Sequence, residues 1–181
     1  MQGCKREWGL SYDELTHLAI KARPFLAVIN PDDPVFLHPG NMPEKIRQFC
    51  IETDQAVPET QGEIVRVALE SLALKYRVVL EQLDELVGKH LEPLHIIGGG
   101  TKNRLLNQLS ADAAGRTVVA GPVEATASGN ILMQAITLGE IDSLENARAL
   151  VRRSFEIEEY HPKDNRRWEQ WFEKNKTLLL A

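Results

Sequence analysis

The clearest pattern of hydrophobic and polar positions in the sequence runs from Thr60 to Val87. Within it, apolar residues recur at every third or fourth position, which places them on one face of an α-helix. They are Ile64, Ala68, Leu72, Tyr76, Val79, Leu83 and Val87. The charged residues Glu63, Arg66, Glu70, Arg77, Glu81 and Asp84 fall on the other side. We therefore predict a helix over residues 60–87 with a broad buried face, a solvated charged face and Gly88 as its C-cap.

Shorter helices are predicted on both sides of this segment. Ser11 and Glu14 have the spacing of a capping box, so a helix should begin there and end before Pro24. Pro43 suits the first position of a helix over residues 44–53. Further helices are expected over residues 124–138 and 143–154, and from residue 162 onward. The last of these carries aromatic residues that should dock it on the core, namely Trp168, Trp171 and Phe172.

Residues 24–43 carry five prolines and are predicted to form an irregular surface excursion. Two apolar pieces, Phe25–Ile29 and Val35–Leu37, should form short edge strands within it. The alternative is an interface arm, since long loops are often functional. Asp32 and Asp33 stand beside prolines in a turn, so we expect them to shape the turn rather than act as a catalytic pair.

A strand, a glycine turn and a helix follow one another in the centre of the chain. Leu94–Ile97 is an apolar run typical of a strand, and three glycines follow it. A helix beginning at Thr101 or Lys102 should end at Gly115, before a second strand over Arg116–Ala120. This order predicts a β-α-β unit, with two parallel strands and a right-handed crossover. The fold class is therefore α/β.

The glycine turn, residues 98–100, has the features of an anion site. Amides at a helix start lack internal partners, the helix dipole favours an anion there, and glycine lets a ligand approach the backbone. The alternative is a tight strand-to-helix reversal without a ligand. Thr101 would cap the helix or donate to a phosphate, and Lys102 would neutralise a phosphate or face solvent. Asn103 calls for a polar partner. The spacing fits neither a Walker A loop nor a dinucleotide fingerprint.

The helix predicted from Glu124 begins with small residues, Ala125-Thr126-Ala127-Ser128-Gly129. Such residues indicate either tight helix packing or a helix start brought close to the glycine turn, and the pattern alone supports both equally. Further on, Phe155–Tyr160 alternates between apolar and polar residues and could form an edge strand.

Composition excludes several classes of function. The net charge of −5 and the lack of a basic face argue against nucleic acid as a partner. No apolar run approaches a membrane span or a signal peptide, so the expected location is the cytoplasm and Cys4 and Cys50 are expected to be reduced thiols. The histidines and cysteines show no metal-binding spacing. None of the acidic residues considered as a catalytic base has a convincing context: Asp32, Asp33, Glu52, Asp54, Asp112 and Glu124.

Residues 98–108, Ala111-Asp112 and Gly121–Ala125 form a distinctive set, supported by residues 11–15, 30–34, 70–76 and 124–130. This set resembles the C-terminal lobe of the FGGY carbohydrate kinases, over essentially the whole chain. The resemblance implies a ribonuclease H-like α/β domain of the actin, hexokinase and Hsp70 ATPase type, with a mixed sheet and flanking helices. Residues 1–181 would form one C-terminal nucleotide-binding domain.

The resemblance also implies binding of ATP or ADP with Mg²⁺, for phosphate transfer to a sugar. It assigns six residues to the nucleotide, with Gly99 central: Gly98, Gly99, Gly100, Thr101, Asn103 and Gln2. The family carries its sugar-binding domain, its metal-linked phosphate motif and its catalytic aspartate upstream, and nothing here matches them. The resemblance therefore implies no catalytic residue and no metal ligand in this chain, which should be catalytically silent by itself. The sugar would be bound through the N-terminal lobe.

Two other functions stay open. One is a kinase lobe of the same family that serves a different sugar, because the sugar contacts lie mostly in the other lobe. The second is a non-catalytic interaction module that pairs with a partner lobe through an exposed apolar surface rather than through the glycine turn.

Overall fold

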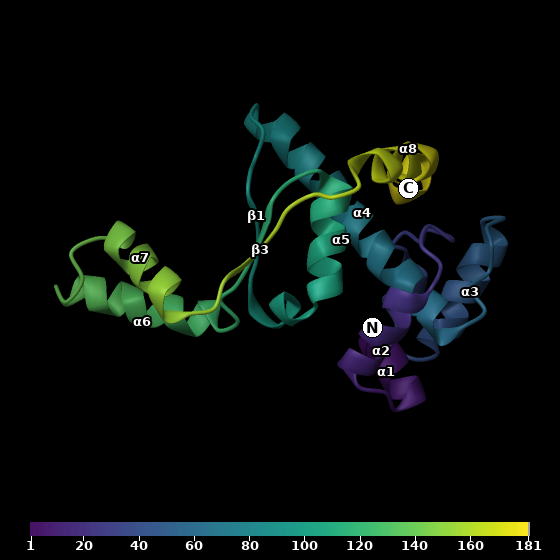
Figure 1. Ribbon diagram of the computed structural model, residues 1–181, viewed down its shortest axis with the longest axis horizontal. Coiled ribbons are helices and arrows are strands. Elements are labelled where there is room, and N and C mark those ends of the chain that lie inside the picture. The colour runs from purple at the N-terminus through teal and green to yellow at the C-terminus, as the bar shows by residue number, and fades with distance from the viewer. Residues whose placement is uncertain (181) are drawn as a thin grey trace.

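The computed structural model describes residues 1–180, which form a helix-rich α/β fold around a small mixed sheet. The helices are α1 (Gln2–Trp8), α2 (Tyr12–Lys21), α3 (Met42–Glu52), α4 (Gln61–Val87), α5 (Arg104–Ala114), α6 (Ala125–Thr137), α7 (Leu144–Ser154) and α8 (Asn165–Leu180). The strands are β1 (Leu94–Ile96), β2 (Val118–Ala120) and β3 (Glu158–Tyr160), and the short 3-10 helices are η1 (Pro34–Phe36) and η2 (Gly98–Lys102). In Figure 1, α4 and α5 lie between α1–α3 on one side and the strands on the other.

The sheet confirms the predicted β-α-β unit. Strands β1 and β2 are parallel, with Leu94 opposite Val118, and α5 connects them. Strand β3 is antiparallel to β2, with Tyr160 opposite Val118, so the expected edge strand also forms. Parallel pairing brings the carboxyl ends of β1 and β2 to the same edge of the sheet. The glycine turn after β1 and Gly121 after β2 therefore share that edge.

Helix α4 organises the core, but the predicted apolar stripe is buried only in its first half. Ile64 and Ala68 are buried, whereas Tyr76, Val79, Leu83 and Val87 are 36–50% exposed, and in the second half Leu74, Val78 and Leu80 are buried instead. Thr60 and Glu63 form a complete capping box at its start, and Gly88 caps its end in the left-handed conformation. Its apolar residues enter two buried clusters. One includes Leu69 and Ala73 with residues of α2, α5 and α8, and the other includes residues of α1 and α3. Most of the apolar burial in the chain is thus built on this helix.

The predicted edge strands at Phe25–Ile29 and Val35–Leu37 are wrong. Phe25 has φ +57°, which is incompatible with a strand, and Pro34–Phe36 forms η1. The backbone of the first piece is held by side chains instead of a neighbouring strand. The N–H of Phe25 donates to Glu70 Oε2 at 2.8 Å, that of Val28 to Gln55 Oε1 at 2.8 Å, and that of Ile29 to Ser71 Oγ at 3.0 Å.

The prediction that the charged face of α4 is solvated is wrong at Arg66 and Arg77, whose side chains are 14% and 13% exposed, and most of all at Glu70. Its side chain is fully buried (0% exposed), and one carboxylate oxygen lies 2.5 Å from Arg66 Nε while the other accepts the Phe25 N–H. Burial raises the pKa of Glu70, and the charge of Arg66 opposes that shift. Glu70 thus anchors the proline-rich excursion to the central helix.

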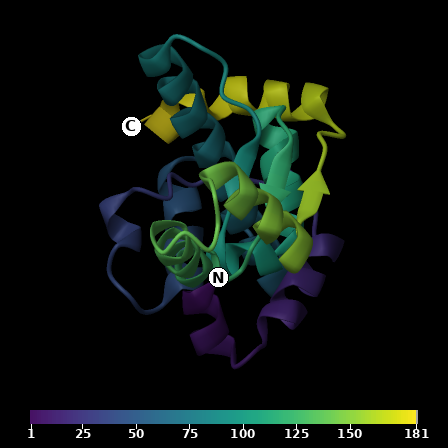
Figure 2. The same cartoon turned by 90° about the vertical axis from the view of Figure 1, so that its left-hand side faces the viewer.

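The C-terminal half contains one packed element and one projecting pair. Helix α8 docks on the core through Trp168 and Phe172, as predicted, and Phe25 contacts Trp168 edge-to-face with ring centroids 5.0 Å apart. Helices α6 and α7 instead project beyond the strands at one end of the molecule (Figure 1), and lie in front of the rest when seen from that end (Figure 2). Helix α6 has no buried residue, so it lies outside the core.

Candidate functional site

The glycine turn forms a single 3-10 segment, η2, between the end of β1 and the start of α5. Gly98 has φ +74°, a conformation that favours glycine. Its N–H donates to Pro122 O at 3.3 Å, which ties the turn to the chain leaving β2. The Asn103 N–H donates to Gly100 O at 3.1 Å and closes the segment. The turn is therefore a defined structure at the carboxyl edge of the two parallel strands.

The amide of Gly99 is the donor that this geometry leaves available. In a 3-10 turn each amide bonds to the carbonyl three residues back, so the first amides have no partner inside the turn. The Gly98 amide uses Pro122 O, whereas Gly99 is exposed and no atom lies within 4 Å of the position that a Cβ would take there. A ligand can approach the backbone at Gly99 without displacing any other part of the chain.

Thr101 and Asn103 have different roles from those predicted for the helix start. The N-cap of α5 is Asn103, whose Oδ1 accepts the N–H of Leu106 at 3.0 Å. The expectation that the helix begins at Thr101 or Lys102, with Thr101 as a possible cap, is therefore wrong. The Thr101 hydroxyl donates instead to Gly98 O at 2.7 Å, within the turn.

Gln2 is exposed and lies in α1, outside the turn. Its neighbour Met1 reaches the turn, because Asn103 Nδ2 donates to Met1 Sδ at 3.1 Å. Gln2 itself lines a separate cavity of about 460 Å³ with Arg6 and Met42. The structure thus gathers five of the six predicted residues, Gly98, Gly99, Gly100, Thr101 and Asn103, and places Gln2 in a different cavity.

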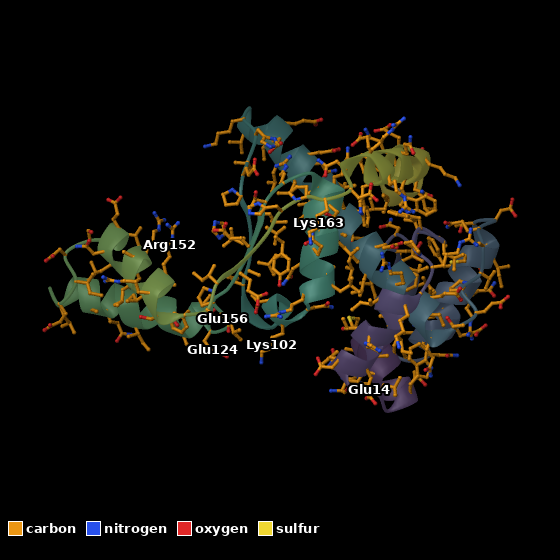
Figure 3. All side chains as sticks on the ribbon, viewed as in Figure 1. Glu14, Lys102, Glu124, Arg152, Glu156 and Lys163 are labelled. Carbon is orange, nitrogen blue, oxygen red and sulfur yellow. The ribbon has the colours of Figure 1, made fainter. Side chains whose placement is uncertain are left out.

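A cleft of about 270 Å³ lies beside the turn at the carboxyl edge of the sheet. It is lined by Thr101, Lys102, Arg104, Ala120, Gly121, Val123, Glu156 and Glu158. Figure 3 shows Lys102 and Glu156 at this edge, with Glu124 near the start of α6. Ligands of α/β proteins commonly bind outside the carboxyl ends of parallel strands. The cleft and the turn therefore occupy the part of the sheet where a ligand is expected.

The acidic wall of this cleft was not identified from the sequence. Glu158 accepts the Tyr160 hydroxyl and pairs with Arg104, and the hydrogen bond from Tyr160 is the main reason that the pKa of Glu158 is lowered. The alternation of apolar and polar residues in Phe155–Tyr160 predicted a strand, but it did not indicate that this strand would pair with β2. Gly121 lets the two segments meet, because a Cβ there would lie 2.7 Å from Glu156 O.

The structure bears on both interpretations of the small residues in α6. Gly129 has no atom within 4 Å of its Cβ position, and α6 buries no residue, so tight packing within residues 1–180 is wrong. For the second interpretation, the structure shows contact of the turn with Pro122 and Val123, which precede α6. The segment leading into α6 meets the turn through the Gly98–Pro122 hydrogen bond, and a Cβ at Gly98 would lie 4.0 Å from Val123 O.

The other candidate groups have structural roles among residues 1–180. Asp33 Oδ1 accepts the Val35 N–H at 2.9 Å, as expected for a residue that shapes a turn, and Asp112 Oδ1 accepts the Lys163 N–H at 2.7 Å. Cys4 and Cys50 are free buried thiols, and burial raises the pKa of Cys50 to about 11.

Residues 1–180 contain no group of three or more His, Cys, Asp or Glu placed to hold a metal. None of their helices is long and apolar enough to cross a membrane.

Comparison with known sequences identifies the family. A profile described as the C-terminal domain of the FGGY family of carbohydrate kinases matches residues 4–138. The chain belongs to the FGGY family of carbohydrate kinases, and what matches is the family's C-terminal domain.

Among its relatives are rhamnulokinases. That of Bacteroides thetaiotaomicron is 48% identical over 170 residues, covering 93% of this chain and 35% of the relative. That of Enterococcus faecalis is 49% identical over 152 residues, covering 83% and 31%. The chain thus spans about a third of the length of the curated relatives it matches.

Solved structures of the same kind share the fold. A crystal structure of Plasmodium falciparum glycerol kinase with ADP superimposes with a TM-score of 0.66 at 19% identity, over 94% of this chain and 34% of the kinase. The xylulose kinase of Rhodospirillum rubrum gives 0.66 at 18% identity, over 99% and 36%. These likenesses confirm the predicted α/β fold class, with a mixed sheet and flanking helices.

Proposed function

We propose that residues 1–181 form the C-terminal, ATP-binding lobe of a carbohydrate kinase, in which the turn Gly98–Lys102 holds the nucleotide phosphates. The observation that carries this proposal is the position of Gly99 at the start of a 3-10 turn, where its backbone is exposed and no atom of residues 1–180 lies within 4 Å of its Cβ position. Membership of the carbohydrate kinase family supports a nucleotide as the ligand, since the family uses ATP with Mg²⁺.

Each residue of the proposed site has a definite part. The Gly99 N–H donates to a phosphate oxygen, and the exposed Lys102 supplies a positive charge beside it. Gly100 keeps the backbone accessible, while Thr101 shapes the turn through Gly98 O. Asn103 Nδ2 has only a weak thioether acceptor in Met1, so it can transfer that donor to the nucleotide. Gln2 borders the site.

Mg²⁺ fits this arrangement only as part of the nucleotide. Residues 1–180 offer no acidic cluster, so the ion would be held mainly by phosphate oxygens and water, which is a common arrangement for Mg²⁺. Bound there, it would neutralise charge on the phosphates. The chain's own contribution is to bind and orient the phosphate donor.

For the reaction, we propose transfer of the γ-phosphate of ATP to L-rhamnulose, giving L-rhamnulose 1-phosphate. Support comes from relatives at 48% and 49% identity that are rhamnulokinases. Phosphoryl transfer to an alcohol needs a carboxylate to accept the hydroxyl proton. Glu158 is paired with Arg104, and Asp112 accepts the Lys163 N–H. We place the base in another part of the enzyme, so residues 1–181 alone should bind nucleotide without transferring phosphate.

Calorimetric titration of residues 1–181 with MgADP tests the nucleotide site. We expect a dissociation constant of ~1 mM or tighter. Gly99→Val should abolish binding without unfolding the chain, because its side chain enters the space that the phosphate needs. Ala56→Val, in the exposed loop between α3 and α4, is the control and should bind normally. Absent binding by the parent chain, or unchanged binding by Gly99→Val, would contradict the proposal.

A chimera tests the sugar. The N-terminal two-thirds of the Bacteroides thetaiotaomicron rhamnulokinase would be joined to residues 1–181 and assayed with ATP and L-rhamnulose, L-xylulose or glycerol. We expect phosphorylation of L-rhamnulose that Gly99→Val abolishes. A chimera that folds and binds ADP but leaves L-rhamnulose unphosphorylated would contradict the substrate assignment while leaving the nucleotide site intact.

A further inference from the structure

Asn107, in the first turn of α5, connects the helix to the glycine turn. Its side chain is fully buried (0% exposed), and its Nδ2 donates to Thr101 O at 2.9 Å. Its main-chain N–H donates to Asn103 O at 3.0 Å. Asn107 therefore holds both ends of the segment Thr101–Asn103, which connects the turn to the helix.

A second hydrogen bond extends this connection to Gly99. The Thr101 hydroxyl donates to Gly98 O at 2.7 Å. In a trans peptide the carbonyl of one residue and the N–H of the next point in opposite directions. Because Gly98 O is held by Thr101, the N–H of Gly99 is turned away from that contact. The position of Thr101, which Asn107 fixes, thus sets the direction of the Gly99 amide.

The environment of Asn107 indicates that an apolar side chain of the same shape would stabilise the fold better than its amide does. Its Oδ1 is buried and has no hydrogen-bond partner among the described residues. A buried unpaired acceptor is destabilising, and an apolar side chain of the same shape would avoid that penalty. The donor side of the amide is used, since it bonds to Thr101 O. The presence of an asparagine at position 107 is explained by the hydrogen bond that it donates to Thr101 O.

We propose that Asn107 is a positioning residue for the nucleotide site, which fixes Thr101 and through it the orientation of the Gly99 N–H. This inference rests on the proposed function, because it takes the Gly99 amide to be a phosphate donor. Nucleotide affinity would then also depend on Asn107, a buried residue that does not itself contact the ligand.

Two variants of matching shape separate this role from simple packing. Asn107→Leu removes the donor and the unpaired acceptor together. Asn107→Asp replaces the donor by a carboxylate that repels Thr101 O when ionised and can donate an O–H to it when protonated. Ser110→Ala is the control, because Ser110 is equally buried on α5 and bonds only to Leu106 O, at 2.7 Å.

Each variant of residues 1–181 would be titrated with MgADP near pH 8 and at about pH 5.5, with the Gly99 amide followed by NMR. We expect Asn107→Leu to keep its thermal midpoint but to bind ADP about tenfold more weakly, as for the loss of one hydrogen bond. Asn107→Asp should bind weakly near pH 8 and regain affinity on acidification. In both variants the Gly99 amide resonance should shift before nucleotide is added.

Two ionisable groups near Asn107 have pKa values that move away from this range. The pKa of Glu158 is lowered, mainly by the hydrogen bond from Tyr160, and the pKa of Tyr160 is raised by burial and then by its hydrogen bond to Glu158. A change in the affinity of Asn107→Asp that the parent chain does not share therefore reports on the introduced carboxyl group.

Two results would overturn the role of Asn107 alone. One is ADP binding by both Asn107 variants within about twofold of the parent, while Gly99→Val fails to bind. The other is an equal loss of affinity in Ser110→Ala. A parent chain that binds no ADP would overturn the proposed function, and the positioning role with it.

Discussion

Glycine serves opposite purposes at the crossing of α2 with α4 and in the glycine turn. A Cβ at Gly62, in α4, would lie 2.6 Å from Leu18 O and 3.0 Å from its carbonyl carbon. At Gly99 the same position has no atom within 4 Å. The chain's own packing requires the first glycine, whereas the space beside the second is not filled by residues 1–180. Open space alone does not mark a ligand site, because Gly9, Gly40, Gly88, Gly129 and Gly139 share it; Gly99 differs from them in lying in the turn at the carboxyl edge of the sheet.

The same difference extends to the surrounding elements. Helix α4 buries twelve residues and carries the ion pair of Glu70 with Arg66, while α6 buries none despite its run of small residues. Substitutions near α4 should therefore change stability and leave nucleotide affinity of the folded chain unaltered. Substitutions at the turn should lower nucleotide affinity and leave stability nearly unchanged.

The largest expected effect is that of Glu70→Ala. It leaves Arg66 and the Phe25 N–H without their buried partner, so the free energy of unfolding should fall by about 3–5 kcal/mol. Urea denaturation measures this loss. Glu81→Ala is the control on the same helix, because Glu81 is 36% exposed in its pair with Arg77 and should cost about 1 kcal/mol or less. Equal losses in the two variants would contradict the anchoring role of Glu70.

Gly62→Val should come next. The added side chain meets the backbone of Leu18, which cannot move without separating α2 from α4, so we expect a loss of about 2–3 kcal/mol. Gly99→Val, which enters open space, should change stability by less than about 0.5 kcal/mol. Thermal unfolding of the two variants side by side makes the comparison, and similar midpoints would remove the distinction between the two glycines.

A smaller effect is expected within the turn itself. Gly98→Ala places a Cβ at φ +74° and should cost about 1 kcal/mol, whereas Gly99→Ala should be nearly neutral. Both unfolding free energies can be obtained from urea titrations. If Gly99→Ala proved to be the more damaging change, the described conformation of the turn would be incorrect.

The smallest expected effect is a loss of stability at low pH through Asp84. The hydrogen bond from Arg116 lowers the pKa of Asp84 from 3.8 to about 2. Because the folded-state pKa is the lower one, the stability contributed by Asp84 is present above pH 3.8 and is lost as the pH falls towards about 2. Urea midpoints measured down this range should fall less steeply in Asp84→Asn. An identical slope in the parent and the variant would contradict the role of this pair.

Local signals predicted most of the fold. The capping box at Ser11, the period of α4 and the β-α-β order all depend on residues close in sequence, and all are present. The strand at Phe25–Ile29 could not be excluded in that way, because the groups that bind its backbone, such as Glu70 and Ser71, lie more than 40 residues away. Those long-range hydrogen bonds override strand propensity.

The candidate site was also predicted only in part. The glycine turn could be predicted because it is a local motif. The wall formed by Glu156 and Glu158 depends on the pairing of β3 with β2, which joins segments about 40 residues apart. The role of Asn103 as a cap rather than a free amide also required the actual start of α5, since helix ends are poorly defined by pattern alone.

Residue-by-residue NMR of residues 1–181 during titration with MgADP tests the central claim most directly. The account predicts that the largest amide shifts occur at Gly98–Lys102, led by Gly99, and at the start of α5. Shifts concentrated instead around Arg6, Glu7 and Met42, or around the cavity beside Lys75, would show that the nucleotide binds elsewhere. That result would contradict the assignment of the glycine turn.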